Sequence, residues 1–168
     1  MKAWIDKRRE SLKTITIGMM TWPVAFFAAW RLAPEVHATD RTGYALQLAV
    51  APALVLLLMI LSCMRLLDKA GAENPFAGAE SDRFKINQRV ITNTLEQGAV
   101  FVPLALGLAM RVPSEHLKVV PIAVAIWCAG RLLFWAGYHV APHWRAPGFD
   151  WTLNTTMLVA GWFVFTLF

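Results

Sequence analysis

The chain has 168 residues, of which 57% are apolar and only 16% are charged, and its formal net charge is +5. An average soluble domain contains about 25% charged residues, so this sequence has too little polar surface to enclose a water-soluble fold. The apolar content also excludes a disordered chain, and the presence of only two cysteines excludes a disulfide scaffold. The basic balance does not indicate a nucleic-acid partner, because the basic residues are distributed as in a membrane protein.

Five apolar segments are long enough to cross a bilayer. A spanning helix needs about 20 mostly apolar residues, and the candidate spans are 14–32, 44–64, 90–110, 119–138 and 151–168. None of them shows the alternating pattern of a membrane barrel strand, and helices are the other structure that satisfies the backbone in lipid. The sequence therefore predicts an all-α integral membrane protein with five spans.

The basic residues predict the orientation of these spans. Eleven of the sixteen lysines and arginines lie in the N-terminal segment, in 65–89 or between the last two spans. Because lysine and arginine favour cytoplasmic segments, the N-terminus is predicted to be cytoplasmic and the C-terminus outside. The long connection 65–85 is then a cytoplasmic loop.

The first span has an alternative interpretation. A basic start, an apolar run and then Val36-His37-Ala38 resemble a cleavable signal peptide. Arg31 in the cleavage region favours an uncleaved span, and spans two to five keep their orientation in either case. Glycines inside the spans are expected to allow close helix contacts. These glycines are Gly18, Gly107, Gly130, Gly137 and Gly161.

The third span opens with polar residues on one helix face. Arg89, Asn93 and Glu96 are spaced i, i+4 and i+7. An intramembrane carboxylate is costly unless it faces the bundle interior or water. An arginine that grips a carboxylate, an amide that donates and accepts, and a glutamate that accepts from an ammonium would suit a zwitterionic ligand. The alternative is a structural polar network that fixes the helix register.

The fourth span carries a second polar pair. Arg131 and Tyr138 are seven residues apart on one face, and Arg145 follows seven residues later. Because a buried charge without a partner is strongly unfavourable, Arg131 is predicted to pair with Glu96. Tyr138 then lies at the cytoplasmic mouth with its phenol free to donate. The polar residues of both spans are thus expected at the cytoplasmic boundary.

These motifs resemble the MAPEG family, the membrane-associated proteins in eicosanoid and glutathione metabolism. The resemblance rests on Arg89-x3-Asn93-x2-Glu96, on Arg131-x6-Tyr138 and on the shared topology, and the stretch 82–97 is similar to bacterial members. It covers 44–168 and implies a four-helix transmembrane bundle there, which assembles as a homotrimer in a bacterial inner membrane. Residues 1–43 would then be a basic segment and one extra transmembrane helix.

The resemblance also implies a site for glutathione, the co-substrate, between neighbouring subunits near the cytoplasmic boundary. The implied glutathione-binding residues are Arg89, Asn93, Glu96, Arg131 and Tyr138, of which Arg131 would be mostly structural. Arg145 matches an arginine that stabilises the glutathione thiolate, so Arg145 and Tyr138 are the expected catalytic residues.

The expected function is glutathione-dependent transfer to lipophilic electrophiles, or reduction of lipophilic hydroperoxides. One alternative is a non-catalytic membrane scaffold, because Phe134 and Thr92 stand where some enzymatic members carry histidine and arginine. A less favoured alternative is a small proton-coupled transporter that uses Glu96. No metal site is expected, since Pro142 interrupts the helix between His139 and His143.

Overall fold

The computed structural model describes residues 2–70 and 80–168, with side chains placed for 8–67 and 80–168. The helices are α1 (Lys2–Leu32), α2 (Arg41–Ala70), α3 (Asp82–Arg111), α4 (Val119–Val140) and α5 (Ala146–Phe165), and the short 3-10 turns are η2 (Ser114–His116) and η3 (Pro142–Arg145). The described part of the chain contains no strand, so the predicted all-α class is confirmed.

Three stretches are long and apolar enough to span a membrane, namely 8–32, 41–67 and 114–140. They contain the first, second and fourth predicted spans. The helices α3 and α5 have 30 and 20 residues, which corresponds to about 45 Å and about 30 Å at the usual helical rise. Charged residues in α3 and polar ones in α5 lower their hydropathy, so the count of five spans stays a prediction.

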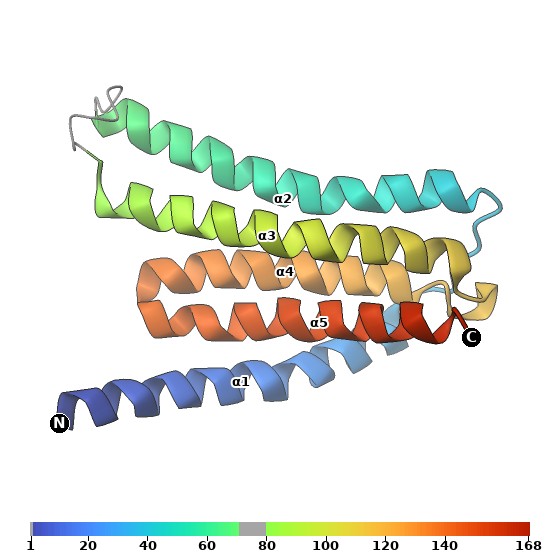
Figure 1. Cartoon of the computed structure of the whole chain (residues 1–168), viewed down its shortest axis with the longest axis horizontal. Coiled ribbons are helices and arrows are strands. Elements are labelled where there is room, and N and C mark those ends of the chain that lie inside the picture. The colour runs from blue at the N-terminus through green and yellow to red at the C-terminus, as the bar shows by residue number, and fades with distance from the viewer. Residues whose placement is uncertain (1, 71–79) are drawn as a thin grey trace.

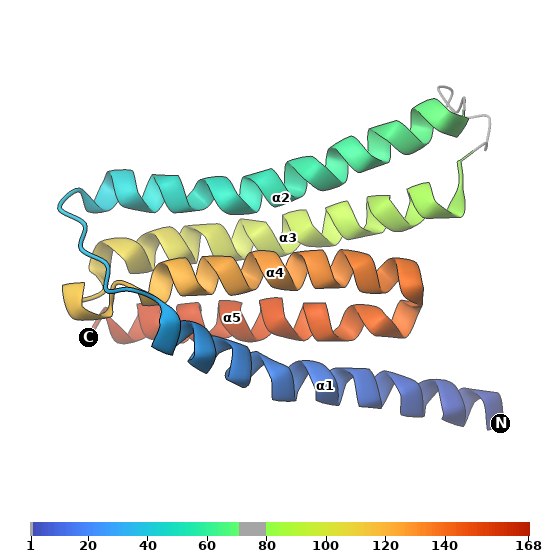
Figure 2. The same ribbon diagram turned by 180° about the vertical axis from the view of Figure 1, so that it is seen from behind.

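The five helices lie side by side and alternate in direction (Figure 1). One end of the bundle therefore collects the starts of α1, α3 and α5 and the ends of α2 and α4. In the reverse view, α2 and α1 again lie at opposite edges, and α1 runs along α5 (Figure 2). This arrangement brings the start of α3, the end of α4 and the start of α5 together.

The helices α2 and α3 extend beyond the predicted spans, and polar residues cap their starts. The Ser81 hydroxyl accepts a hydrogen bond of 3.2 Å from the Phe84 amide at the start of α3, which satisfies one of the unpaired amides of the first turn. The Asp40 carboxylate likewise accepts a hydrogen bond of 2.9 Å from the Gly43 amide at the start of α2. The predicted loop 65–85 is wrong at both ends, because α2 continues to Ala70 and α3 begins at Asp82. The middle of the loop, 71–79, lies outside the described residues.

The buried core consists of two apolar clusters. In the larger one, Phe101 of α3 stacks on Trp127 of α4, with ring centroids 5.0 Å apart. The smaller one contains Val90 and Phe134. Large apolar side chains also cover the outside of the bundle, as Met20 does with 68% of its surface exposed. Such an apolar exterior is costly in water and suited to contact with lipid tails.

The helix α1 is joined to α5 by two reciprocal hydrogen bonds. The Trp22 indole donates to the Thr155 hydroxyl at 2.9 Å, and the Trp151 indole donates to the Thr21 hydroxyl at 3.0 Å. Because an indole N–H buried without an acceptor is costly, these pairs fix how α1 lies on α5. The first helix is thus packed mainly against α5, with further contacts to α4.

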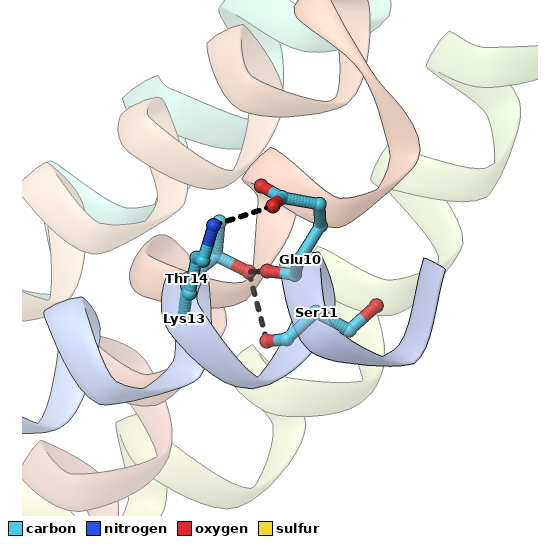
Figure 3. A network of polar contacts seen from close by, with 4 residues as sticks. All are labelled: Glu10, Ser11, Lys13 and Thr14. Carbon is cyan, nitrogen blue, oxygen red and sulfur yellow. Dashed lines mark hydrogen bonds and ion pairs between the residues drawn. The ribbon is translucent and has the colours of Figure 1, made fainter. Parts of the chain in front are cut away.

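A polar group precedes the apolar part of α1 (Figure 3). Lys13 and Glu10 form an ion pair of 2.6 Å, and the Thr14 hydroxyl donates to the backbone oxygens of Ser11 and Glu10 at 3.0 and 3.3 Å. The ion pair is exposed and so contributes little to stability. The buried Thr14 hydroxyl is satisfied within its own helix, which lets this face pack against its neighbours.

Glycines allow the closest helix contacts. Of the predicted positions, Gly18, Gly107, Gly130 and Gly137 approach another part of the chain so closely that an added Cβ would collide. The prediction is wrong for Gly161, because nothing lies within 4 Å of its Cβ position. Gly148 was not predicted, although its Cβ position overlaps the backbone of Phe134 and Gly130. The tightest contact of α5 with α4 therefore depends on a glycine outside the predicted spans.

We expect Gly148→Ala to destabilise the bundle and Gly161→Ala to leave it nearly unchanged. The methyl group at 148 would meet backbone atoms that cannot move aside, and overpacking of this kind costs about 1–3 kcal/mol. Thermal unfolding of both variants in the same detergent tests this expectation. Equal melting temperatures for the two variants would contradict the α4–α5 contact described here.

Candidate functional site

A pocket of about 530 Å³ opens at the end of the bundle where α3 and α5 begin. It brings together four predicted site residues, which are Arg89, Asn93, Tyr138 and Arg145. Its apolar wall includes Phe134 and Phe149, and α1 contributes Ile15. One carboxylate, that of Asp150, also lines the pocket. The pocket thus combines two guanidinium groups, an amide, a phenol and a carboxylate with an aromatic wall.

Arg145 is held against Tyr138. Its guanidinium donates to the phenol oxygen at 3.0 Å and lies 5.1 Å from the ring centroid. The chain returns to this position because η3 follows α4 at once and Gly137 lets the Trp144 backbone approach. Since the phenol oxygen accepts from Arg145, its own hydrogen is available to a second acceptor. The pair therefore presents several donors to an anion.

Arg131 lies inside the bundle, and its predicted pairing with Glu96 is wrong. The side chain is fully buried, and it donates to the Asn93 amide oxygen at 2.9 Å and to the Thr152 hydroxyl. Glu96 is exposed and forms no ion pair with any residue that the structure describes. Asn93 faces α4 and reaches Arg131, whereas Glu96, three residues further along α3, does not. Neutral acceptors and the Phe134 ring, 4.7 Å away, stabilise the buried charge.

The pocket therefore excludes two of the predicted residues. Arg131 lies behind the Phe134 ring and does not line the pocket, and Glu96 lies on the outside of α3. Their contact with glutathione stays a prediction. Asn93 joins the two regions, because it lines the pocket and also accepts from Arg131.

A second polar cluster, centred on the buried Asn87, was not predicted. The Asn87 side-chain oxygen accepts from the Trp135 indole at 2.9 Å and lies 2.7 Å from a ring nitrogen of His139. The Asn87 amide donates to Ser62 at 3.2 Å, so the cluster links α2, α3 and α4. His139 is thus engaged in packing, and the described residues contain no group of three or more ligands that could hold a metal.

Asp150 was also not predicted as a site residue. It precedes the apolar segment 151–168, and it is the only acidic residue between 116 and 168, which is the one signal that the sequence offers. Its Oδ2 atom is buried without a hydrogen-bond donor in the part of the chain that the structure describes. Burial raises the pKa of Asp150 to about 6, because the charged form loses its hydration.

We expect Asp150→Asn to stabilise the ligand-free protein at a pH well above 6 and to have less effect well below it. The folded-state pKa of Asp150 lies above that of an unfolded chain, so its contribution to stability is lost as the pH rises through about 6. The amide carries no charge to desolvate. Melting temperatures of the unmodified protein and of Asp150→Asn, measured against pH, test this expectation. A pH-independent difference for Asp150→Asn would contradict the expectation.

Comparison with known proteins identifies the family of the chain. The model of the MAPEG family matches residues 44–165. The chain is also 37% identical over 124 residues to an uncharacterized protein of the cyanobacterium Synechocystis sp., and the match covers 73% of this chain and 87% of that protein. Since the family match covers most of the sequence and contains all of the pocket except Ile15, the chain belongs to the MAPEG family.

Proposed function

We propose that the protein is a membrane-bound, glutathione-dependent transferase or peroxidase that acts on lipophilic electrophiles or hydroperoxides. The Arg145–Tyr138 contact carries this proposal, because it places anion-stabilising donors in a pocket that also contains Arg89 and Asn93. Family membership supports it independently.

Glutathione fits the polar side of the pocket. The Arg89 guanidinium can bind a carboxylate through two hydrogen bonds, and the Asn93 amide can donate to a backbone oxygen of the tripeptide. Phe134 and Phe149 offer an apolar wall to a substrate that arrives from the bilayer. The site would thus hold a polar thiol and an apolar electrophile side by side.

The proposed chemistry begins with deprotonation of the glutathione thiol. A free thiol has a pKa of about 8.5, and the Arg145 guanidinium and the Tyr138 hydroxyl would donate to the sulfur anion and favour it. The proton passes to water. In transfer, the sulfur forms a bond to an electrophilic carbon, and the displaced electron pair leaves with a leaving group or on an oxygen that is then protonated. In peroxide reduction, two thiols are oxidised to a disulfide while the hydroperoxide becomes an alcohol and water.

The proposal includes the setting that the sequence favours. The protein would cross a bacterial inner membrane five times, with a cytoplasmic N-terminus and an external C-terminus, so that glutathione enters from the cytoplasm. In a homotrimer, the exposed Glu96 of α3 would face a neighbouring subunit, where it could contact glutathione held between the chains.

Two alternatives receive less support from the geometry. A non-catalytic scaffold would agree with Phe134 and Thr92, which stand where some enzymatic members carry histidine and arginine. It would give no role to the contact of Arg145 with Tyr138 in an open pocket. A proton-coupled transporter that uses Glu96 would need this carboxylate in the interior of the bundle. Glu96 is exposed on the outside of α3.

We expect Arg145→Ala to lose the ultraviolet thiolate absorbance that appears when glutathione is added to the detergent-purified protein. Removal of one anion-stabilising donor typically lowers turnover by about 100-fold or more, so kcat for a lipophilic electrophile should fall on that scale. Arg111→Ala is the matched control, because Arg111 lies at the other end of α3 and donates to the Thr166 backbone oxygen. Loss of assembly in Arg145→Ala would assign Arg145 to structure instead, and an unchanged thiolate signal in the assembled variant would contradict its proposed role.

A further inference from the structure

The apolar side of the pocket comes from two parts of the chain. Phe134 of α4 and Phe149 of α5 pack together with ring centroids 6.5 Å apart, and both lie inside the family match. Ile15 lines the same pocket but belongs to α1, which precedes that match. An apolar acceptor of the thiol would therefore meet the two aromatic rings and this isoleucine.

The helix α1 is held firmly on α5 at the level of the pocket. A Cβ at position 18 would lie 2.8 Å from the Pro147 Cα atom, so a glycine is needed for α1 to pass this close to the start of α5. The two tryptophan–threonine hydrogen bonds described above hold the turns that follow. Because Ile15 lies one turn before Gly18, the same contact fixes its backbone beside the pocket.

Ile15 stands at the edge of the face that α1 packs against its neighbours. The preceding residue, Thr14, is buried, whereas Ile15 keeps 37% of its surface exposed. The helices α1 and α3 lie on opposite sides of α5 (Figures 1 and 2), so Ile15 lies across the pocket from Arg89 and Asn93. An isoleucine in a helix has one strongly preferred χ1 rotamer, so this side chain is a rigid part of the wall.

The space left for an acceptor is small, because one pocket has to hold two reactants. Its volume is about 530 Å³, which lies within the range of roughly 300–1,000 Å³ that is usual for a site with one drug-sized ligand. A tripeptide thiol would fill much of it. A rigid side chain at the edge of the remaining space then limits what fits beside the aromatic rings.

We propose that Ile15 determines the size of the acceptor, so that the site favours compact electrophiles and short-chain hydroperoxides over long-chain ones. The inference rests on the proposed function and narrows its substrate class. The selectivity would come from the first helix and not from the part of the chain that matches the family.

The test uses S-methylglutathione and S-hexylglutathione, in which an alkyl chain takes the place of the acceptor. Calorimetry on the detergent-purified protein gives the ratio of the two affinities without any chemical step. Ile15→Ala should raise the preference for the hexyl compound about tenfold, because the space that it opens admits one or two more methylenes and each is worth about fourfold in affinity. Ile15→Trp, which fills the space, should lower this preference.

Ile17→Ala is the matched control for the truncation. Ile17 lies on the same helix and is similarly exposed, at 43%, but two residues turn it by about 200° around the helix axis, and it does not line the pocket. Its truncation should leave the ratio unchanged. Should Ile15→Ala fail to fold, Ile15→Val should raise the ratio by a smaller factor.

The outcomes separate this inference from the function on which it rests. An unchanged ratio in Ile15→Ala, or an equal rise in Ile17→Ala, would overturn the role of Ile15 and leave glutathione-dependent chemistry intact. A lower ratio in Ile15→Ala would overturn it too, because Ile15 would then bind the acceptor without limiting its size. Binding of glutathione but of neither thioether would overturn the inference alone. Failure of all three ligands to bind would overturn the proposed function as well.

Discussion

The buried guanidinium of Arg131 sets the register of three helices. Arg131 belongs to α4 and is fully buried. Its guanidinium donates hydrogen bonds to Asn93 on α3 and to Thr152 on α5. The two terminal nitrogens of the guanidinium are bonded and Nε has no partner among the described residues. Sliding the helices would remove the acceptors that this buried charge has, which is strongly unfavourable. Asn93 also lines the pocket. The same constraint that stabilises the bundle therefore orients one side of the candidate site.

The site features that could be predicted from the sequence depend on the spacing of residues that are close together in the chain. Arg131, Tyr138 and Arg145 lie on one short stretch, and their spacing was enough to predict that Tyr138 and Arg145 lie at the same end of the bundle. The hydrogen bond between these two residues was not predicted. The predicted partner of Arg131, Glu96, was wrong because opposite charge does not determine which residues of α3 face α4. An amide oxygen and a hydroxyl oxygen can accept hydrogen bonds from a guanidinium as a carboxylate can, and the residue types Asn and Thr give no sign of this role in the sequence. Asp150 was missed for another reason, since its burial depends on Gly18, more than a hundred residues away.

The helix α1 lies outside the family match and still contributes to the candidate site. The family match begins at Tyr44, yet α1 is bound to α5 through reciprocal tryptophan–threonine contacts and contributes Ile15 to the pocket. An added helix that only anchored the protein would need no such contacts. Here it covers the side of the pocket that α5 borders, so the site has a wall that the matched region does not supply.

The short turn between α4 and α5 limits how such a protein can diverge. The four residues of η3 and the close approach at Gly137 together place Arg145 over Tyr138. A helix rotates by about 100° for each residue, so one inserted residue here would carry the arginine out of the pocket and turn the buried threonines of α5 away from their partners. Relatives that keep the chemistry can accumulate substitutions throughout the lipid-facing surface, but we expect the length of this turn to be inherited unchanged.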